Sequence, residues 1–194
     1  MLASRSIQSS STLASKIGSL DYILISSILL LGVVSMFAMY STDGGSFDYH
    51  TKSHIIRFLL FFSFFIIISF FQLRFWYHTS TFIYLIFFIL LLGVKYFGLT
   101  SSGSQRWINF YFMNLQPSEL MKVGLILFLC KYYHRIPSHE VNKIKFLFLP
   151  IISMLAPVLL VITQPDLGTS ILIAVGGIFV AWLAGVKVKF FTYL

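Results

Sequence analysis

Long apolar runs alternate with short polar segments along most of this chain, and each run approaches the length of a membrane-spanning helix. A helix that crosses the hydrocarbon layer needs roughly 20 apolar residues, with about 17 to 25 as the usual range. The sequence predicts six spans, at about Tyr22–Tyr40, Ile55–Phe71, Phe82–Phe97, Glu119–Tyr133, Phe146–Thr163 and Thr169–Val186. The run from Glu119 is short and carries polar groups, so it is the least lipid-like. We therefore predict an all-α polytopic membrane domain over residues 21–194.

Basic residues are divided unequally between the two sides that these spans define. One side collects the N-terminus and the second, fourth and final loops, and its lysines and arginines are Arg5, Lys16, Arg74, Lys131, Arg135, Lys143, Lys145, Lys187 and Lys189. The opposite loops hold Lys52 and Arg106 beside Asp43, Asp48 and Asp166. Because cytoplasmic loops carry an excess of lysine and arginine, this asymmetry predicts a cytoplasmic N-terminus. The loop Gly103–Ser118 and the turn Gln164–Asp166 then lie together on the outer side.

The composition is typical of a membrane protein and argues against several other classes of protein. Of the 194 residues, 58% are hydrophobic and 10% are charged, whereas soluble proteins carry roughly 25% charged residues. The net charge of +8 falls in short loops between spans, which favours the positive-inside pattern over a nucleic-acid partner. The single cysteine, Cys130, excludes an intramolecular disulfide. The five histidines lie in or beside loops at spacings that form no metal-ligand set.

The first 20 residues are rich in serine and include Arg5 and Lys16 but no acidic residue. A transit peptide has such a composition. A cytoplasmic tail that is disordered or lies on the membrane surface has it as well, and we favour this interpretation. The sequence therefore predicts a tail of residues 1–20 before the membrane domain.

The segment Gln116–Lys122 contains the charges that are hardest to explain by helix formation alone. Proline at the first helical position and an acid in the first turn are ordinary features of a helix start, so they account for Pro117 and Glu119. Lys122 lies three residues further along and on the same face as Glu119. A lone cation near the bilayer centre costs about 2.5–3.5 kcal/mol on insertion scales. We therefore predict an ion pair that faces a protein-lined cavity on the outer side.

Two other outer segments carry polar groups that could join this cavity. Arg106 can bind a phosphate or a carboxylate through its forked donors, and the neighbouring Trp107 is typical of the membrane interface. Asp166 could cap the helix that begins near Thr169, because Pro165 and Gly168 indicate a tight turn there. Alternatively, Asp166 lines one polar cavity with Arg106 and the pair at the head of the fourth span.

These segments resemble a known family. The stretches GSQRWINFYFMNLQPSELMK (103–122) and ITQPDLGTSIL (162–172), and also the first span at 20–41, resemble the SEDS proteins, a bacterial family of shape, elongation, division and sporulation proteins. The form QPDLGTS resembles the rod-elongation branch of the family more than its division branch. The likeness covers most of the chain from about Lys16 onward, and three motifs in the same order make it specific.

The resemblance implies a peptidoglycan glycosyltransferase that polymerises lipid II on the outer face of the bacterial inner membrane, beside a class B penicillin-binding protein. Carried over by motif, the substrate-binding positions are Arg106, Trp107, Gln116, Ser118, Glu119, Lys122 and Asp166, with Pro117 in the same motif. A base for the acceptor hydroxyl and cations for the leaving pyrophosphate suit such a site. No cofactor is implied with certainty, although a divalent metal such as Mg²⁺ would suit a pyrophosphate leaving group.

The chain also departs from the family pattern. Members have about ten spans, and the acid regarded as catalytic lies in a large outer loop after the seventh, whereas this sequence stops at Leu194. We therefore expect the N-terminal part of such a protein, whether as a fragment, a truncated product or half of a split enzyme, without polymerase activity in isolation.

Two alternative functions remain. One is a flippase or transporter whose path is lined by Arg57, Glu119 and Lys122. The other is an inactive protein that only docks other membrane proteins.

Overall fold

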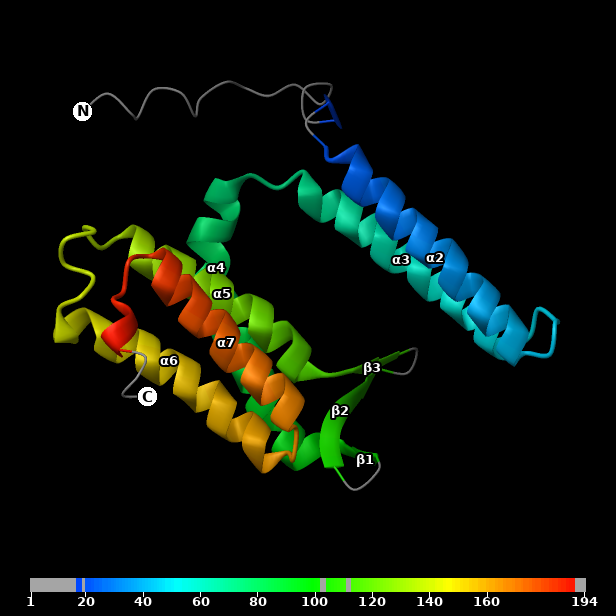
Figure 1. Cartoon of the computed structure of the whole chain (residues 1–194). Helices are drawn as coiled ribbons and strands as arrows, with labels where there is room; N and C mark the ends of the chain where they lie inside the picture. Colours follow the sequence, from blue (N-terminus) through cyan, green and yellow to red (C-terminus); the bar gives the residue numbers. More distant parts are fainter. Residues whose placement is uncertain (1–16, 19, 102–103, 111–112, 191–194) are drawn as a thin grey trace. The chain divides into compact units, whose positions relative to one another are not determined.

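The computed structural model describes residues 17–18, 20–101, 104–110 and 113–190, and it contains helices and one small sheet (Figure 1). The helices are α2 (Tyr22–Thr42), α3 (Tyr49–Ser69), α4 (Leu73–Phe97), α5 (Pro117–His134), α6 (Ile144–Thr163) and α7 (Leu167–Leu183), followed by the 3-10 turn η1 (Val188–Phe190). The strands are β1 (Leu99–Ser101), β2 (Ser104–Phe110) and β3 (Met113–Leu115). The chain forms two compact units that meet in sequence at Gln72 and Leu73.

Unit 1 is an antiparallel hairpin of α2 and α3. The turn between the helices contains Gly44 and Gly45 at φ values of 69° and 83°, a conformation that residues with a Cβ rarely adopt. Asp43 closes this turn because its carboxylate accepts hydrogen bonds from the backbone N–H and the hydroxyl of Thr51, at 2.8 and 2.7 Å. These bonds lower the pKa of Asp43 below its ordinary value. The carboxylate therefore stays ionised and holds the start of α3.

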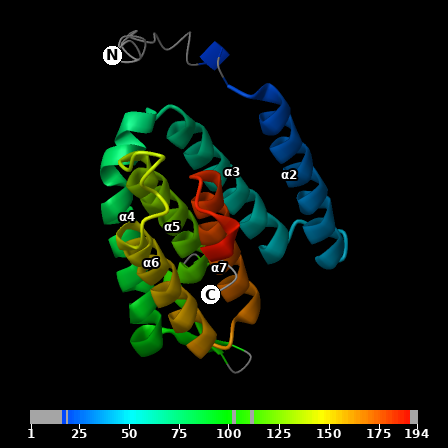
Figure 2. The same ribbon diagram turned by 60° about the vertical axis from the view of Figure 1, so that its left-hand side comes forward.

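Unit 2 is a bundle of α4, α5, α6 and α7, with the sheet at one end (Figure 2). In this bundle α5 packs against α4 on one side and against α7 on the other. The core consists of apolar side chains that are almost wholly buried, including Leu91, Met121, Leu125, Val161 and Ile173. Small residues permit close approach. A Cβ on Gly177 of α7 would lie 2.7 Å from the sulfur of Met154 on α6, so a larger residue there would require the Met154 side chain to shift.

Two prolines inside α6 are compensated by neighbouring helices. In an α-helix the N–H of each residue bonds to the carbonyl four residues earlier, and proline lacks this donor. Pro150 and Pro157 therefore leave the carbonyls of Phe146 and Ser153 without a backbone hydrogen-bond donor. The Tyr132 hydroxyl of α5 donates to the Phe146 carbonyl at 3.0 Å. The Tyr84 hydroxyl of α4 donates to the Ser153 carbonyl at 2.8 Å. Each carbonyl is thus satisfied, as a hydrocarbon environment requires.

The outward faces of the helices remain strongly apolar. Leu31, Phe37, Phe82 and Leu172 are all more than half exposed, which in water would be unfavourable and in lipid is expected. By length and composition, four helices within the described residues can cross a membrane: α2, α3, residues 73–94 of α4, and α6. The prediction of a mostly helical polytopic membrane protein is confirmed. Helix α7 is apolar but has 17 residues, and α5 carries Glu119, Lys122 and Lys131.

The structure corrects several predicted boundaries. Helix α3 begins at Tyr49 rather than Ile55 and ends at Ser69 rather than Phe71. Helix α4 begins at Leu73 rather than Phe82, so Arg74 lies in its first turn and not in a loop. Helix α7 spans Leu167–Leu183 rather than Thr169–Val186. The early turns of α4 are helical because they pack on α5, where Arg135 donates to the Tyr77 hydroxyl at 2.9 Å.

Candidate functional site

The polar residues of the two motifs meet at the sheet end of unit 2, where α4 and α6 end and α5 and α7 begin. The sheet is antiparallel in the order β1-β2-β3, with Leu99 opposite Trp107 and Ile108 opposite Leu115. It returns the chain from the end of α4 to the start of α5, and it carries Arg106 and Trp107 on β2. The predicted outer loop thus contains short strands that the sequence analysis did not predict.

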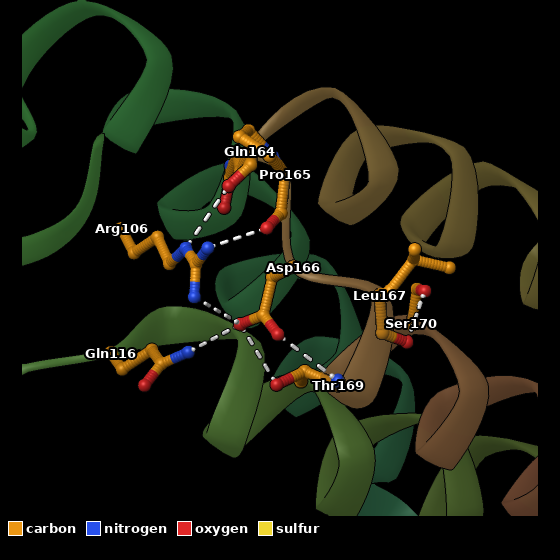
Figure 3. A network of polar contacts seen from close by, with 8 residues as sticks. All are labelled: Arg106, Gln116, Gln164, Pro165, Asp166, Leu167, Thr169 and Ser170. Carbon is orange, nitrogen blue, oxygen red and sulfur yellow. Dashed lines mark hydrogen bonds and ion pairs between the residues drawn. The ribbon is translucent and has the colours of Figure 1, made fainter. Parts of the chain in front are cut away.

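Asp166 is the centre of a hydrogen-bonded network at this end (Figure 3). It occupies the N-cap of α7, where its carboxylate accepts from the backbone N–H of Thr169 at 3.1 Å and from the Thr169 hydroxyl at 2.9 Å. The amide of Gln116 donates to the same carboxylate at 2.9 Å. The side chain of Asp166 is 11% exposed. The predicted capping role of Asp166 is confirmed, and the helix begins two residues earlier than expected.

Gln116 connects the start of α5 to the start of α7. It occupies the N-cap of α5, with Pro117 as the first helical residue and Ser118 buried behind it. The side chains that stand at the starts of two different helices are therefore hydrogen bonded to each other. Both helix starts have positive partial charge, which favours the single carboxylate between them.

Arg106 connects β2 to the turn between α6 and α7. Its Nε donates to the carbonyl of Gln164 at 3.0 Å, and one terminal nitrogen donates to the carbonyl of Pro165. Its other terminal nitrogen lies 3.7 Å from the carboxylate of Asp166. The amide of Gln164 in turn donates to the carbonyl of Leu91 on α4, at 3.4 Å. The guanidinium thus binds the protein itself, at the carbonyl end of α6, where a cation is favourable.

Glu119 and Lys122 form a different kind of contact. Their side chains lie on one face of α5, with 2.8 Å between the Lys122 nitrogen and a Glu119 carboxylate oxygen. The side chain of Glu119 is 54% exposed and that of Lys122 is 25% exposed. The predicted ion pair is confirmed. The ammonium has three donors and this contact uses one.

A comparison with protein-family models identifies the family to which these motifs belong. The model of the FtsW, RodA and SpoVE family, described as a cell cycle protein, matches residues 17–194. The chain belongs to this family. The SEDS resemblance inferred from the motifs is thereby confirmed, and the match includes both the Gln116–Lys122 segment and the Asp166 turn.

Curated members of the family have related names. The chain is 40% identical over 108 residues to "Peptidoglycan glycosyltransferase MrdB" of Escherichia coli K12, which covers 56% of this chain and 29% of that protein. It is 32% identical over 169 residues to "Probable peptidoglycan glycosyltransferase FtsW" of Buchnera aphidicola subsp. Baizongia pistaciae, which covers 84% of this chain and 44% of that protein. The chain thus spans less than half the length of these relatives.

Solved structures of the family share the fold. The RodA D255A mutant of Thermus thermophilus matches with a TM-score of 0.76 and 22% identity, over 87% of this chain and 55% of that one. A chain described under "Structural coordination of polymerization and crosslinking by a peptidoglycan synthase complex" matches with a TM-score of 0.62 and 24% identity, over 86% and 48%. At these identities the likeness shows the fold of the SEDS membrane domain.

The structure separates the predicted site residues into two groups and adds others. Arg106, Gln116 and Asp166 meet in one network, and Glu119 contacts Lys122. Trp107 is half buried on β2, and Ser118 is buried at the start of α5. That all seven residues line one substrate cavity remains a prediction. Sequence reasoning did not assign roles to Gln164 and Thr169, although both lie within the motif ITQPDLGTSIL.

The described carboxylates of this region do not form a magnesium site. Mg²⁺ prefers an octahedral set of oxygen ligands. Asp166 is already engaged by Arg106, Gln116 and Thr169, and Glu119 by Lys122. Among the described residues, no group of three or more histidine, cysteine, aspartate or glutamate side chains is placed to hold a metal ion.

Proposed function

We propose that this chain is the N-terminal part of a peptidoglycan glycosyltransferase that polymerises lipid II. Membership of the family and the names of the relatives support this activity. The observation that carries the proposal is the position of both family motifs at one end of the bundle, where they leave a partly exposed ion pair at the head of α5. An anionic lipid headgroup at the membrane surface would meet this pair first.

The two groups of residues have different roles in this proposal. Lys122 contacts the substrate, because its remaining donors can bind a phosphate oxygen of the lipid-linked pyrophosphate. Glu119 accepts a hydrogen bond from the ammonium of Lys122 and thereby holds it in place. Arg106, Gln116 and Asp166 position the ends of the helices around the substrate. Their hydrogen bonds are made within the protein, and they act on the substrate indirectly.

The orientation and the partner follow from the same proposal. Within unit 2 the sheet end carries Glu119 and Asp166, and the opposite end carries Lys131, Lys143, Lys145, Lys187 and Lys189. This division supports a cytoplasmic N-terminus in the bacterial inner membrane. The substrate would then be bound on the outer face. A class B penicillin-binding protein is the proposed partner, because one structural relative comes from a complex that couples polymerisation to cross-linking.

Polymerisation of labelled lipid II tests the proposed function. The full-length protein, reconstituted with its penicillin-binding partner, is compared with Lys122→Ala and Glu119→Ala. We expect Lys122→Ala to reduce the rate at least tenfold, since a charge-assisted hydrogen bond contributes about 1.5–3 kcal/mol. Lys52→Ala, on the separate hairpin unit, is the matched control and should keep the wild-type rate.

Two outcomes would contradict the proposal. Wild-type rates in both Lys122→Ala and Glu119→Ala would remove the pair from the mechanism. Vesicles in which the reconstituted protein moves lipid II across the bilayer without polymerising it would favour transport.

A further inference from the structure

Unit 1 carries a charged side chain beside the middle of a membrane-spanning helix. Gly32 is the buried central residue of α2, and the ring of Phe58 on α3 packs against it. Ser35, three residues further along α2, is hydrogen bonded to His54 at 2.8 Å. Helix α2 has 21 residues, which is about 31 Å and close to the hydrocarbon thickness of about 30 Å. The segment of α3 from His54 to Phe58, which contains Arg57, therefore lies near the bilayer centre.

Arg57 has one partner among the described residues. A terminal nitrogen of its guanidinium donates to the hydroxyl of Ser53, one turn nearer the start of α3. The guanidinium has five donors, so most of its hydrogen-bonding capacity is unused, and the side chain is exposed. Snorkelling toward Ser53 draws the charge toward the helix start, yet Ser53 itself lies about 6 Å inside it. An unpaired cation at this depth costs free energy, so Arg57 needs a stronger partner than a serine hydroxyl.

Arg57 belongs to an outward-facing stripe of α3. Ser53, Arg57, Leu60 and Phe64 follow one another at helical spacing along one face, and the residues that contact α2 lie on another. Leu60 and Phe64 are 51% and 56% exposed. These two side chains suit either lipid or a neighbouring helix, whereas the arginine requires an anion. This Arg57 face (Ser53, Arg57, Leu60 and Phe64) therefore fits an apolar occupant that carries one negative charge.

All six acidic residues of the chain already have partners. The pairs are Asp21 with Leu24, Asp43 with Thr51, Asp48 with Ser46, Glu119 with Lys122, Glu140 with Lys143, and Asp166 with Arg106. A second copy of the chain, whose acidic residues are engaged in the same way, therefore offers no free carboxylate to the Arg57 face. The three aspartates of unit 1 also lie beyond the ends of α2 and α3, away from the level of Arg57. Charge complementarity thus points to a different molecule.

We infer that the Arg57 face binds one transmembrane helix of another membrane protein, and that an aspartate or glutamate in the middle of that helix accepts hydrogen bonds from the guanidinium. Arginine is suited to this contact because its forked donors match a carboxylate. Polar side chains also connect helices within membranes by hydrogen bonds. Leu60 and Phe64 supply the apolar part of the contact. The inference does not depend on the glycosyltransferase proposal, which uses residues of unit 2 alone.

A synthetic helix tests this contact. The probe is an apolar transmembrane peptide of about 20 residues with a single glutamate at its centre, and the reference peptide has leucine there. Energy transfer in vesicles, from a donor on the peptide to an acceptor attached to the full-length protein at the exposed Cys130, measures the two affinities. We expect the glutamate peptide to bind at least about tenfold more tightly than the leucine peptide, because a hydrogen bond between charged groups contributes this much or more.

Matched variants separate this contact from general electrostatic attraction. Arg57→Leu should bind both peptides equally, whereas Lys52→Leu removes a positive charge from the same helix and should keep the preference. Arg57→Glu should reverse it, in favour of a peptide with arginine at its centre. Leu60→Trp places a bulky ring on the Arg57 face and should weaken binding severalfold, whereas Leu59→Trp, on a different face and 56% exposed, should not. Circular dichroism verifies the helix content, and Arg57→Gln, with the same expected loss of preference, replaces Arg57→Leu if that variant does not fold.

Four results would overturn the inference. Equal affinity of the wild type for the glutamate and leucine peptides would mean that lipid or another span of the same protein satisfies Arg57. An unchanged preference in Arg57→Leu would place the contact elsewhere. An equal loss of preference in Lys52→Leu would indicate attraction by overall charge. Self-association of the protein that Arg57→Leu abolishes would assign the face to a second copy of the chain.

Discussion

The two groups of charged residues in the motifs differ in what they bind. Arg106 and Asp166 come from segments 60 residues apart, and their contacts reach two carbonyls, an amide and the start of a helix. Glu119 and Lys122 are three residues apart on one helix, and both are partly exposed. The first group holds separate parts of the chain together. The second adds little to the fold and leaves donors for a ligand. Polar residues within one motif can thus have different roles, either to hold the fold together or to leave donors for a ligand.

Removal of Asp166 should give the largest loss of stability. Asp166→Ala deletes the cap of α7 and leaves Arg106 and Gln116 without their shared acceptor. Loss of the cap costs about 1 kcal/mol, and loss of the hydrogen bonds to the charged carboxylate costs about 1.5–3 kcal/mol. We expect this decrease in the free energy of unfolding, measured in mixed micelles. Asp166→Asn keeps the shape and should be less destabilising. A loss below that of Glu119→Gln would show that the network is not structural.

Arg106→Lys should have the next largest effect. A lysine keeps the charge but has no planar fork, so it cannot reach both carbonyls and the carboxylate together. We expect a loss of about 1.5–2 kcal/mol in unfolding free energy, of the size of one charge-assisted hydrogen bond. The double variant Arg106→Lys and Asp166→Asn measures the coupling. Strict additivity of the two losses would mean that the residues do not act together.

Tyr84→Phe provides a neutral reference for these charged contacts. It removes one hydrogen bond between helices, which in membrane proteins is worth about 0.6–1.7 kcal/mol. The loss should shrink in a Pro157→Ala background, because alanine restores the N–H that the Ser153 carbonyl otherwise lacks. The measurement is a double-mutant cycle of unfolding free energies. If the loss is the same in both backgrounds, the proline is not the reason for the tyrosine contact.

Glu119→Gln should have the smallest effect on stability and a disproportionate effect on activity. Exposed ion pairs at this spacing contribute about 0.5 kcal/mol or less, and salt weakens them. The unfolding free energy should therefore change little, while the rate of lipid II polymerisation falls. A change in stability as large as that of Arg106→Lys would contradict the distinction between the two groups.

Much of this arrangement could be predicted from the sequence because lipid imposes simple rules on it. The runs that became α2 and α6 are continuously apolar, so length alone identifies them. The spacing of Glu119 and Lys122 fixed their contact as soon as the segment was taken as a helix. The turn indicated by Pro165 and Gly168 predicted the cap of α7, because it places Asp166 at the start of a helix, where a carboxylate accepts from a free backbone N–H.

Other features depended on contacts between distant segments. The first turns of α4 contain Arg74, Trp76 and His78, which interrupt the apolar pattern, yet packing on α5 keeps them helical. The short strands around Arg106 gave no clear period in the sequence. The Arg106 side chain points toward carbonyls of the turn at Gln164 rather than outward. That turn is distant in sequence, so the residues around Arg106 could not predict this direction. The sequence did contain a signal for the contact between each proline's turn and a tyrosine. The carbonyl four residues before each proline lacks its helical donor, so it needs a donor from another helix.

The tyrosine contacts of α6 bear on the order in which the protein assembles. Alone in the bilayer, α6 would present two bare carbonyl groups to hydrocarbon, where each costs free energy. The hydroxyls that relieve this come from α4 and α5, both of which leave the ribosome earlier. A nascent α6 therefore meets its partners already in place, and moving the gene segment for α6 ahead of them would deprive it of those donors at the moment of insertion.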